Sequence, residues 1–496
     1  MFFALKQIME KTMYYKLKKG CFIRQYGSYG YITSTGIYND QLFNESGAAF
    51  LSVLTREPQS LEVLADKIVN KFVDVSKNEI INDVAEFFNN LVSDGFVSCG
   101  ETAEECNETD IGFTYANEPV IKTVEDFSPV VKRSSNNTQE LLREQLLKQP
   151  QIGSFQIEIT SKCNERCIHC YIPHAYKVNN MRPELFYKIL DELDAMHVLN
   201  VTLSGGEPMT HPNFVEFLKA AKARDFNVGV LSNLTLLTDE IVDILKDGNP
   251  AFVQVSLYSM DPEHHDAITT VEGSFEKTKN AILKLVENNV PVQISCPVMK
   301  ANKDDYVGVM EWAHSHNIRS ETDYAIMAEY NHDTSNLANR LSPEECREVL
   351  TQILEADESY QDAIMSDSFD SEVEKLNHDE DKPFCGVGVS TCCVVSNGDV
   401  FPCPGWQSMV CGNLEADTLQ NIWEHSEKLN CLRSIRRKDI PECLHCKEKA
   451  FCSPCLARFA NESPTGNPME VAKHFCEVAK VNKEVVYQWL SSHKRN

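Results

Sequence analysis

Three cysteines carry the clearest chemical signal in the sequence: Cys163, Cys167 and Cys170, spaced as CxxxCxxC. Thiolates this close together can bind three corners of a cubane iron-sulfur cluster, and the lack of a fourth protein ligand leaves one iron open to another molecule. The alternative is a structural zinc site, which needs four ligands in a closed shell. Because His169 is wedged between two of the cysteines, the motif favours the cluster over zinc.

A predicted strand at residues 155–160 leads into this cysteine motif. Phe155, Ile157 and Ile159 alternate with polar residues, which is the pattern of a half-buried strand. The motif resembles the signature of radical SAM enzymes. That resemblance implies that the three cysteines are catalytic and that the open iron binds S-adenosylmethionine, whose reductive cleavage gives a 5'-deoxyadenosyl radical that abstracts hydrogen from a substrate.

A second motif, Gly205-Gly206-Glu207, follows the next predicted strand at residues 200–203. Glycines let the backbone approach a ligand closely, and Glu207 offers a carboxylate to an ammonium group. Its position after the cysteine motif resembles the radical SAM segment that binds the methionyl amine of the cofactor.

Strands and helices alternate from residue 151 to about residue 340. The strands are expected near Phe155, Asn200, Val228, Phe252, Val292 and Glu321. This alternation predicts a parallel sheet, and about six units suit an α/β fold with a partial (β/α)6 barrel. Active sites of barrels lie at the carboxyl ends of the strands, where the cysteine motif also falls.

Polar residues at two later strand ends are further cofactor candidates. In the radical SAM family such positions contact the ribose, which singles out Ser232, Asn233 and Ser256. Polar residues at strand ends are also ordinary caps, and that alternative stays open.

Seven cysteines near the C-terminus form the second strong signal. They are Cys385, Cys403, Cys443, Cys446, Cys452, Cys455 and Cys476. Seven thiols exceed one metal site and fit two iron-sulfur clusters, with two zinc knuckles as the alternative. The pattern resembles the SPASM extension of radical SAM enzymes, which holds two auxiliary clusters.

The same resemblance distributes these cysteines between the two clusters. One cluster would use Cys443, Cys446, Cys452 and Cys476. The other, nearer the active site, would use Cys385, Cys403 and Cys455 and would lack a fourth ligand.

The hairpin turn at Asn397-Gly398 suggests where the missing ligand lies. Counting back from a two-residue turn pairs Ser396 with Asp399 and therefore Cys392 with Cys403. Since paired residues share a sheet face, Cys392 is predicted as the fourth ligand in preference to Cys393. The alternative is that this strand simply buries two small thiols.

Residues 1–105 are predicted to form a small α+β domain. Two alternating runs at residues 21–25 and 29–33 indicate a hairpin, and helical patterns follow. The helices are expected at residues 44–54, 60–72 and 76–93. This order resembles the winged-helix recognition element of RiPP maturases, which modify ribosomally made peptides. The resemblance implies that the leader of a precursor adds a strand to the hairpin's edge, against the third helix.

A DNA-binding or merely structural winged helix is the alternative for this domain. The formal net charge of −26 opposes nucleic-acid binding, because phosphates would be repelled. Asp83 and Glu86 make the third helix itself poorly suited to a DNA groove.

The remaining segments connect and close these domains. Residues 106–150 are expected to be a linker that ends in a helix at 138–147. Residues 341–382 are a bridging segment with one helix, followed by an acidic, weakly patterned stretch at 357–381 that is expected to be a solvated face or loop. Residues 383–496 are the SPASM-like domain, with a closing helix at 477–490.

The cysteine content and the lack of a long apolar run predict a cytoplasmic protein. Nineteen cysteines clustered at metal-ligand spacings point to metal binding in a reducing compartment rather than to disulfides. No apolar run is long enough to span a bilayer, and the N-terminus lacks the order of a signal peptide, so no membrane partner is expected.

The resemblance to radical SAM enzymes with a SPASM extension and a RiPP recognition element implies an oxidoreductase that uses S-adenosylmethionine and three 4Fe-4S clusters to modify a precursor peptide. An electron donor such as flavodoxin or ferredoxin is expected. Thioether crosslinks of the sactipeptide or ranthipeptide type are the favoured product. Carbon-carbon crosslinking or another peptide oxidation, a formylglycine-generating sulfatase maturase and a non-enzymatic iron-sulfur electron carrier are the alternatives.

Overall fold

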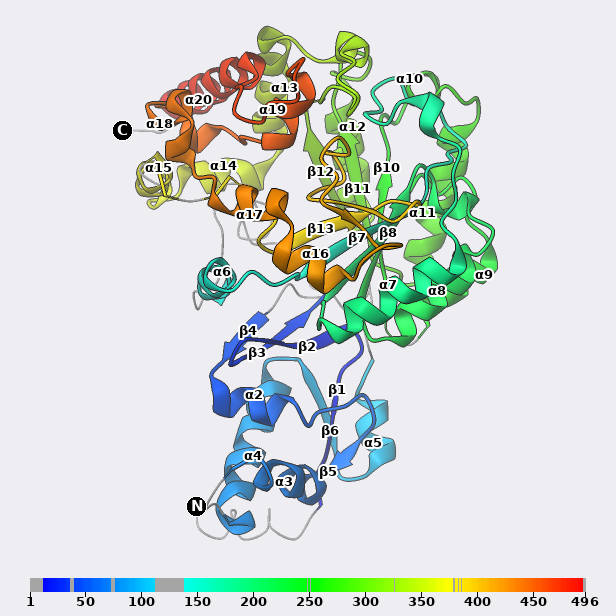
Figure 1. Ribbon diagram of the computed structural model, residues 1–496, viewed down its shortest axis with the longest axis vertical. Coiled ribbons are helices and arrows are strands. Elements are labelled where there is room, and N and C mark those ends of the chain that lie inside the picture. Colours follow the sequence, from blue (N-terminus) through cyan, green and yellow to red (C-terminus); the bar gives the residue numbers. More distant parts are fainter. Residues whose placement is uncertain are drawn as a thin grey trace.

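A small N-terminal domain lies below a larger body that contains the barrel and the cysteine-rich C-terminal region (Figure 1). The structure is a computed structural model. It describes residues 12–35, 40–72, 76–111, 138–247, 249, 251–324, 326–377, 380–381, 383–384 and 386–493.

Two three-stranded sheets and three helices make up most of the N-terminal domain. The first sheet has the order β5-β1-β6 and the second β2-β3-β4. The strands are β1 (Tyr14–Leu17), β2 (Cys21–Tyr26), β3 (Tyr29–Ser34), β4 (Asp40–Phe43), β5 (Gln59–Ser60) and β6 (Val97–Gly100). The helices are α2 (Glu45–Leu51), α3 (Leu61–Val69) and α4 (Lys77–Ser93). The predicted hairpin and three helices are therefore present, whereas β1, β4, β5 and β6 are additional.

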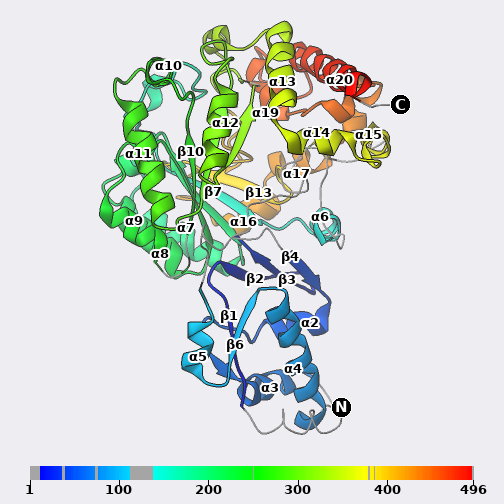
Figure 2. The ribbon, with the colours of Figure 1, turned by 180° about the vertical axis from the view of Figure 1, so that it is seen from behind.

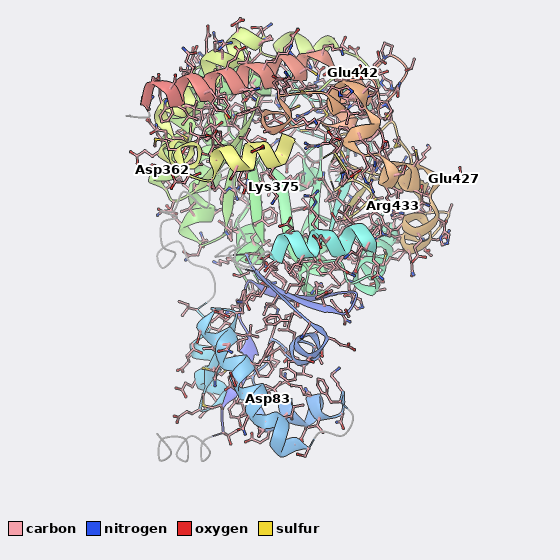
Figure 3. All side chains as sticks on the ribbon, turned by 90° about the vertical axis from the view of Figure 1, so that its left-hand side faces the viewer. Asp83, Asp362, Lys375, Glu427, Arg433 and Glu442 are labelled. Atoms are coloured by element: carbon pink, nitrogen blue, oxygen red, sulfur yellow. The ribbon has the colours of Figure 1, made fainter. Side chains whose placement is uncertain are left out.

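The third helix, α4, packs one apolar face into the core of this domain. Val84, Phe88 and Leu91 are buried on that face, while Asp83 is exposed on the helix (Figure 3). The helix stops at Gly95, whose φ of 87° favours glycine, and the amide of Phe96 donates back to the Leu91 carbonyl.

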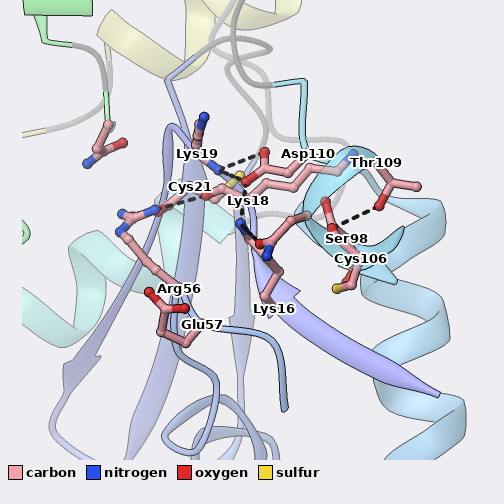
Figure 4. Close-up of polar contacts among 12 residues, drawn as sticks. Lys16, Lys18, Lys19, Cys21, Arg56, Glu57, Ser98, Cys106, Thr109 and Asp110 are labelled. Carbon is pink, nitrogen blue, oxygen red and sulfur yellow. Dashed lines mark hydrogen bonds and ion pairs between the residues drawn. The ribbon is translucent and has the colours of Figure 1, made fainter. Parts of the chain in front are cut away.

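The N-terminal domain extends past residue 105 because α5 (Ala103–Glu108) packs against β6. Cys106 on this helix is fully buried. Just after it, the Asp110 carboxylate lies 3.1 Å from Nζ of Lys16, and both side chains are almost fully buried (Figure 4). The amide of Lys19 also donates to Asp110. This contact ties the start of the expected linker to β1.

The barrel contains six parallel strands in the order β12-β11-β10-β9-β8-β7, as predicted. They are β7 (Ser154–Thr160), β8 (Asn200–Gly205), β9 (Asn227–Ser232), β10 (Phe252–Ser256), β11 (Val292–Pro297) and β12 (Arg319–Asp323). The intervening helices are α7 (Pro183–Ala195), α8 (Phe214–Ala223), α9 (Asp239–Lys246), α10 (Pro262–Thr269), α11 (Ser274–Glu287) and α12 (Tyr306–Ser315). Phe155, Ile157 and Ile159 of β7 are fully buried in the core beneath them.

Three short strands from the C-terminal region extend the barrel sheet beyond β7. These are β13 (Thr391–Val394), β14 (Asp399–Phe401) and β15 (Gly412–Asn413). β13 runs parallel to β7, so one continuous sheet joins the cysteine-rich region to the barrel. Helices α8, α9 and α11 lie on the side of the sheet away from the C-terminal helix α20 (Lys473–His493) (Figures 1 and 2).

The predicted register of the β13–β14 hairpin is wrong by one residue. Cys393 pairs with Phe401 and Val394 with Val400, so the loop closes at Val395 and Asp399. The loop therefore has three residues, with Gly398 in the left-handed region at φ 86°. A three-residue loop of this kind ends in a left-handed glycine. Compared with the predicted two-residue turn, it shifts every pair of the hairpin by one residue.

The bridging segment is more ordered than its acidic composition suggests. After α13 (Pro343–Ala356), which begins at a capping box formed by Ser342, the chain forms α14 (Glu358–Met365) and α15 (Phe369–Asn377). Ile364 and Phe369 are buried in a core shared with the closing helix α20. The prediction of a solvated face or loop at residues 357–381 is thus wrong, because these apolar side chains fill that core.

Contacts from the N-terminal domain hold it against the base of the barrel. Arg24 donates to the backbone carbonyls of Val198 and Asp225, and Arg56 Nε lies 2.6 Å from the Asp225 carboxylate. Helix α6 (Thr138–Lys148), predicted at 138–147, adds Leu142 to the packing over β2 and β3. Within the described residues, no helix combines the length and apolar composition required to cross a membrane.

Candidate functional site

The loop that follows β7 brings the three cysteines of the first motif together. All three side chains are half-buried, and the amide of Glu165 donates to Cys163 Sγ at 3.4 Å. The hydroxyl of Tyr258 donates to Cys167 Sγ at 3.9 Å. Burial raises the pKa of Cys167, and Glu165, Cys170 and Cys163 raise it further. Three neighbouring thiols with hydrogen-bond donors to sulfur suit an iron-sulfur cluster.

Two buried polar atoms beside the cysteines lack a hydrogen-bond partner: Nδ1 of His169 and Oε1 of Glu165. Burial lowers the pKa of His169 to about 4, so its imidazole is neutral near pH 7. Burial raises the pKa of Glu165 to about 7, with the nearby Glu207 as a second cause. Buried polar atoms normally have partners, so these two are consistent with a further group at this site.

The Gly205-Gly206 turn packs directly on the backbone of the cysteine loop. The amide of Gly206 donates to the Thr160 carbonyl at 2.9 Å, and that of Glu207 to the Lys162 carbonyl at 2.8 Å. A Cβ on Gly206 would lie 2.4 Å from the Lys162 carbonyl oxygen, and one on Gly205 would lie 2.0 Å from that of Thr160. Neither position accepts a side chain while the two loops stay in contact.

The carboxylate of Glu207 joins this turn to the end of β9. It accepts hydrogen bonds from the Ser232 hydroxyl at 2.9 Å, the Asn233 amide at 2.7 Å and the Met209 amide at 2.9 Å. Burial raises its pKa to about 7. Asn233 also donates from its side chain to Asn164 in the cysteine loop at 3.0 Å. The structure therefore brings Glu207, Ser232 and Asn233 together beside the cysteines.

Ser256 is linked to the cysteines indirectly, through the side chain of Tyr258. It lies at the end of β10 as a hydrogen-bond partner of the Tyr258 side chain, whose hydroxyl also contacts Cys167. Tyr258 packs edge-on against His169, with ring centroids 5.2 Å apart. Tyr258 was not predicted from the sequence, although its position just after the strand end at Ser256 could have indicated it.

A buried carboxylate, Glu158, lies on β7 and was also missed. It is only 4% exposed, and Nε2 of Gln407 donates to both of its oxygens at 2.9 Å. Burial raises its pKa to about 7. The pKa of Tyr171 is raised by burial and then by Glu158, Cys170, Cys403 and Cys393. The Tyr171 phenol therefore lies between the first cysteine motif and the C-terminal cysteines.

Four of the C-terminal cysteines converge: Cys443, Cys446, Cys452 and Cys476. Burial and the proximity of the other three thiols together raise the pKa of Cys452 to about 12. The amide of Glu448 donates to Cys446 Sγ at 3.4 Å. They lie on α18 (Pro441–Leu444), on α20 and around the short helix η6 (Lys449–Phe451).

The cysteines predicted to bind the other auxiliary cluster are brought together only in part. Cys403 and Cys455 both pack against the core around Trp406. Cys385 lies outside the described residues. Cys392 is directed to the barrel core with Val394 and Val400, whereas Cys403 packs against the separate core around Trp406. Among the described residues, no three His, Cys, Asp or Glu side chains lie close enough to hold a single metal ion.

Three family models match separate parts of the chain. The radical SAM superfamily matches residues 157–313, the SPASM iron-sulfur cluster-binding domain residues 385–447, and the coenzyme PQQ synthesis protein D family residues 41–97. These matches fall on the barrel, the C-terminal cysteines and the N-terminal domain respectively.

Similar proteins include the AdoMet-dependent heme synthase of Methanosarcina barkeri, at 25% identity over 61% of this chain and 90% of that protein. The mycofactocin maturase MftC of Mycolicibacterium smegmatis is 26% identical over 63% of this chain and 80% of its own length. Other relatives match over only 33% to 55% of their length.

A solved structure shares the whole fold. It is that of Streptococcus suis SuiB bound to the precursor peptide SuiA, with a TM-score of 0.58 and 16% identity. The match covers 93% of this chain and 99% of that chain.

Proposed function

We propose that this chain, which is a radical SAM enzyme with a SPASM and a PqqD-type domain, modifies a ribosomally made precursor peptide. The observation that carries the proposal is the presence of all three domains in one chain, because the third adds a peptide-binding fold to the catalytic pair. The likeness to SuiB, whose structure holds a precursor peptide, supports the same substrate class.

The first cysteine motif is assigned to the cofactor. Cys163, Cys167 and Cys170 would hold a 4Fe-4S cluster, and the turn at Gly205, Gly206 and Glu207 would border S-adenosylmethionine. The unpartnered atoms of His169 and Glu165 and the glycine turn fit such a group. When bound, cluster and cofactor supply the 5'-deoxyadenosyl radical. Ser232 and Asn233 orient Glu207, while Ser256 acts through Tyr258.

The C-terminal cysteines are assigned to two auxiliary 4Fe-4S clusters, which makes three in the chain. Cys443, Cys446, Cys452 and Cys476 would hold one, which their mutual proximity supports. Cys403 and Cys455, with Cys385, would hold the other. A flavodoxin or ferredoxin would supply electrons.

The leader of the precursor would bind at the edge of β4. The predicted hairpin gains β4 as a third strand, so among the described residues the edge strand of this sheet beside α4 is β4 rather than β3. Phe43 on β4 packs edge-on against Phe87 of α4 at 5.1 Å, and Phe50 packs against Phe87 at 5.2 Å. These rings are only half-buried, which suits an incoming strand with apolar side chains.

The favoured product is a thioether between a cysteine sulfur and a carbon of another residue. It requires removal of one hydrogen atom from carbon and loss of the thiol proton and one electron, so the peptide loses about 2 Da per link. Glu158, buried between the two groups of cysteines, is a suitable acceptor for that proton. A carbon-carbon link or another peptide oxidation is the second candidate for this scaffold.

Leader binding tests the peptide assignment directly. The probe is a fluorescently labelled precursor peptide from a short cysteine-rich reading frame beside the gene. We expect Phe43→Asp to weaken its binding to the full-length chain at least tenfold, whereas Val63→Asp, at a 45% exposed position on α3, leaves it unchanged. Equal affinity of the wild type and Phe43→Asp would contradict binding at this edge.

A further inference from the structure

Two adjacent cysteines on β13, Cys392 and Cys393, point to opposite faces of the sheet. Paired residues of neighbouring strands share a face of the sheet. The pairings of β13 with β7 and with β14 therefore show which face each thiol is on. Cys392 is paired with Phe155 of β7, and Cys393 with Gln156.

The Cys392 side of β13 faces the apolar core of the barrel. Its paired residue, Phe155, is fully buried there, and Val394 and Val400 lie in the same core. The Cys392 thiol donates to the Phe401 carbonyl at 3.1 Å. This thiol therefore has both an apolar environment and a hydrogen-bond acceptor.

The Cys393 side faces the interior of the site. Gln156 on this face donates to the Ser204 hydroxyl at 2.7 Å, and the next residue on the same face of β7 is Glu158. Across the hairpin, Cys393 pairs with Phe401. Cys403 follows just after the end of β14, and Cys393 and Cys403 both raise the pKa of the same buried phenol, Tyr171, which indicates that the two thiols lie near each other on this side of the sheet.

We propose that Cys393, and not Cys392, is the missing thiolate ligand of the auxiliary cluster held by Cys403 and Cys455. This inference rests on the proposed function, since it needs a cluster at that position. Cys393 is fully buried, and among the described residues its thiol has no hydrogen-bond acceptor comparable to that of Cys392. Iron prefers soft sulfur ligands, and a fourth thiolate would close the coordination of the cluster.

Closed coordination changes the role expected of this cluster. A fully ligated cluster has no free iron for the peptide thiolate, so it serves as an electron acceptor. The cysteine of the peptide would then lose its proton to a protein group without binding to iron.

Adjacent substitutions test the ligand. The full-length chain carrying Cys163→Ala, Cys167→Ala and Cys170→Ala retains only the auxiliary clusters, and is reconstituted anaerobically with iron and sulfide. In this background, we expect Cys393→Ala to change the electron paramagnetic resonance spectrum of one reduced cluster and to shift its midpoint potential upwards, because a negative ligand is lost. The matched variant Cys392→Ala is expected to reproduce the parent spectrum and potential.

Cys393→Ser provides a second variant, because an alkoxide can still bind iron with less disturbance of the fold. We expect it to shift the spectrum of the same cluster while iron content stays unchanged. If both Cys393 variants match the parent, or if Cys392→Ala alone changes the spectrum, the inference is overturned. A parent protein with no auxiliary cluster signal would instead contradict the cluster assignment in the proposed function, and the ligand with it.

Discussion

Gln407 donates from Nε2 to both carboxylate oxygens of Glu158 at 2.9 Å, although the two residues are 249 positions apart in the chain. Glu158 lies on the first barrel strand and Gln407 follows Cys403 in the C-terminal region. The pair therefore fixes the auxiliary cysteines relative to the first cysteine motif. A neutral amide compensates a buried carboxylate only in part, which leaves its pKa near 7.

Replacement of this carboxylate should change the pH dependence of stability. The pKa of Glu158 rises from 4.5 to about 7 on folding, so the folded state holds the proton more tightly than the unfolded state. The free energy of unfolding therefore falls as pH rises from about 4.5 to about 7. At about 1.4 kcal/mol per pKa unit, the penalty at pH 8 is of the order of 3 kcal/mol.

Glu158→Gln removes the titration and keeps an oxygen acceptor for Gln407. We expect its thermal midpoint, relative to the wild type, to be higher at pH 8 than at pH 5. Anaerobic calorimetry at both pH values measures the difference. An identical offset at the two pH values would show that the carboxyl does not titrate in this range.

Removal of the first three cysteines should separate the two kinds of cluster. With Cys163, Cys167 and Cys170 all replaced by alanine, we expect no 5'-deoxyadenosine from S-adenosylmethionine and dithionite. Iron content should fall from about twelve to about eight atoms per chain, following the stoichiometry of 4Fe-4S clusters. Persistent cleavage, or an iron content unchanged from wild type, would refute the assignment.

A methyl group on Gly206 should disrupt the site without unfolding the barrel. A Cβ there meets backbone oxygens at 2.4 and 2.6 Å, which cannot rotate away, so the turn must leave the cysteine loop. We expect Gly206→Ala to reduce 5'-deoxyadenosine formation at least a hundredfold. Gly308→Ala on α12 is the control, because its Cβ meets nothing within 4 Å. Equal rates for both variants would contradict this role of the turn.

Breaking the buried ion pair between Lys16 and Asp110 should lower the free energy of unfolding more than breaking a similar pair at the surface. Asp110→Asn leaves the buried Lys16 ammonium without its carboxylate, which costs about 3 kcal/mol of unfolding free energy. Asp66→Asn breaks an even shorter pair with Lys77, at 2.7 Å, but both side chains are exposed, so its cost is below about 1 kcal/mol. Urea unfolding of the two variants measures these costs. Comparable values would contradict the larger contribution of the buried pair to stability.

Local patterns in the sequence predicted the elements that hold the first site. All six barrel strands, the glycine turn and the α4 helix with its stop at Gly95 follow from alternation, turn chemistry and helical periodicity. Distant contacts were not predictable in this way. The addition of β13 to β7 depends on residues more than two hundred positions apart, and Glu158 gains its partner Gln407 only through that addition.

The error in the predicted register of the β13–β14 hairpin has a specific physical origin. The Asn397-Gly398 sequence fits both a two-residue turn and a three-residue loop that ends in a left-handed glycine, and the structure has the second. Because side chains alternate between faces, that single residue directs Cys392 to the barrel core and Cys393 to the opposite face of the sheet. The bridging helices α14 and α15 were not predicted, because their apolar residues are buried only by packing against the distant helix α20.

Intact-mass measurement of a precursor peptide tests the central claim most directly. The peptide encoded beside the gene is incubated anaerobically with the reconstituted full-length chain, S-adenosylmethionine and dithionite. We predict a loss of about 2 Da per crosslink, with one cysteine per link resistant to alkylation. The same loss with every cysteine still alkylatable would replace the thioether by a carbon-carbon link. An unchanged mass in the presence of abundant 5'-deoxyadenosine and tightly bound precursor would contradict the proposal that this enzyme modifies the peptide.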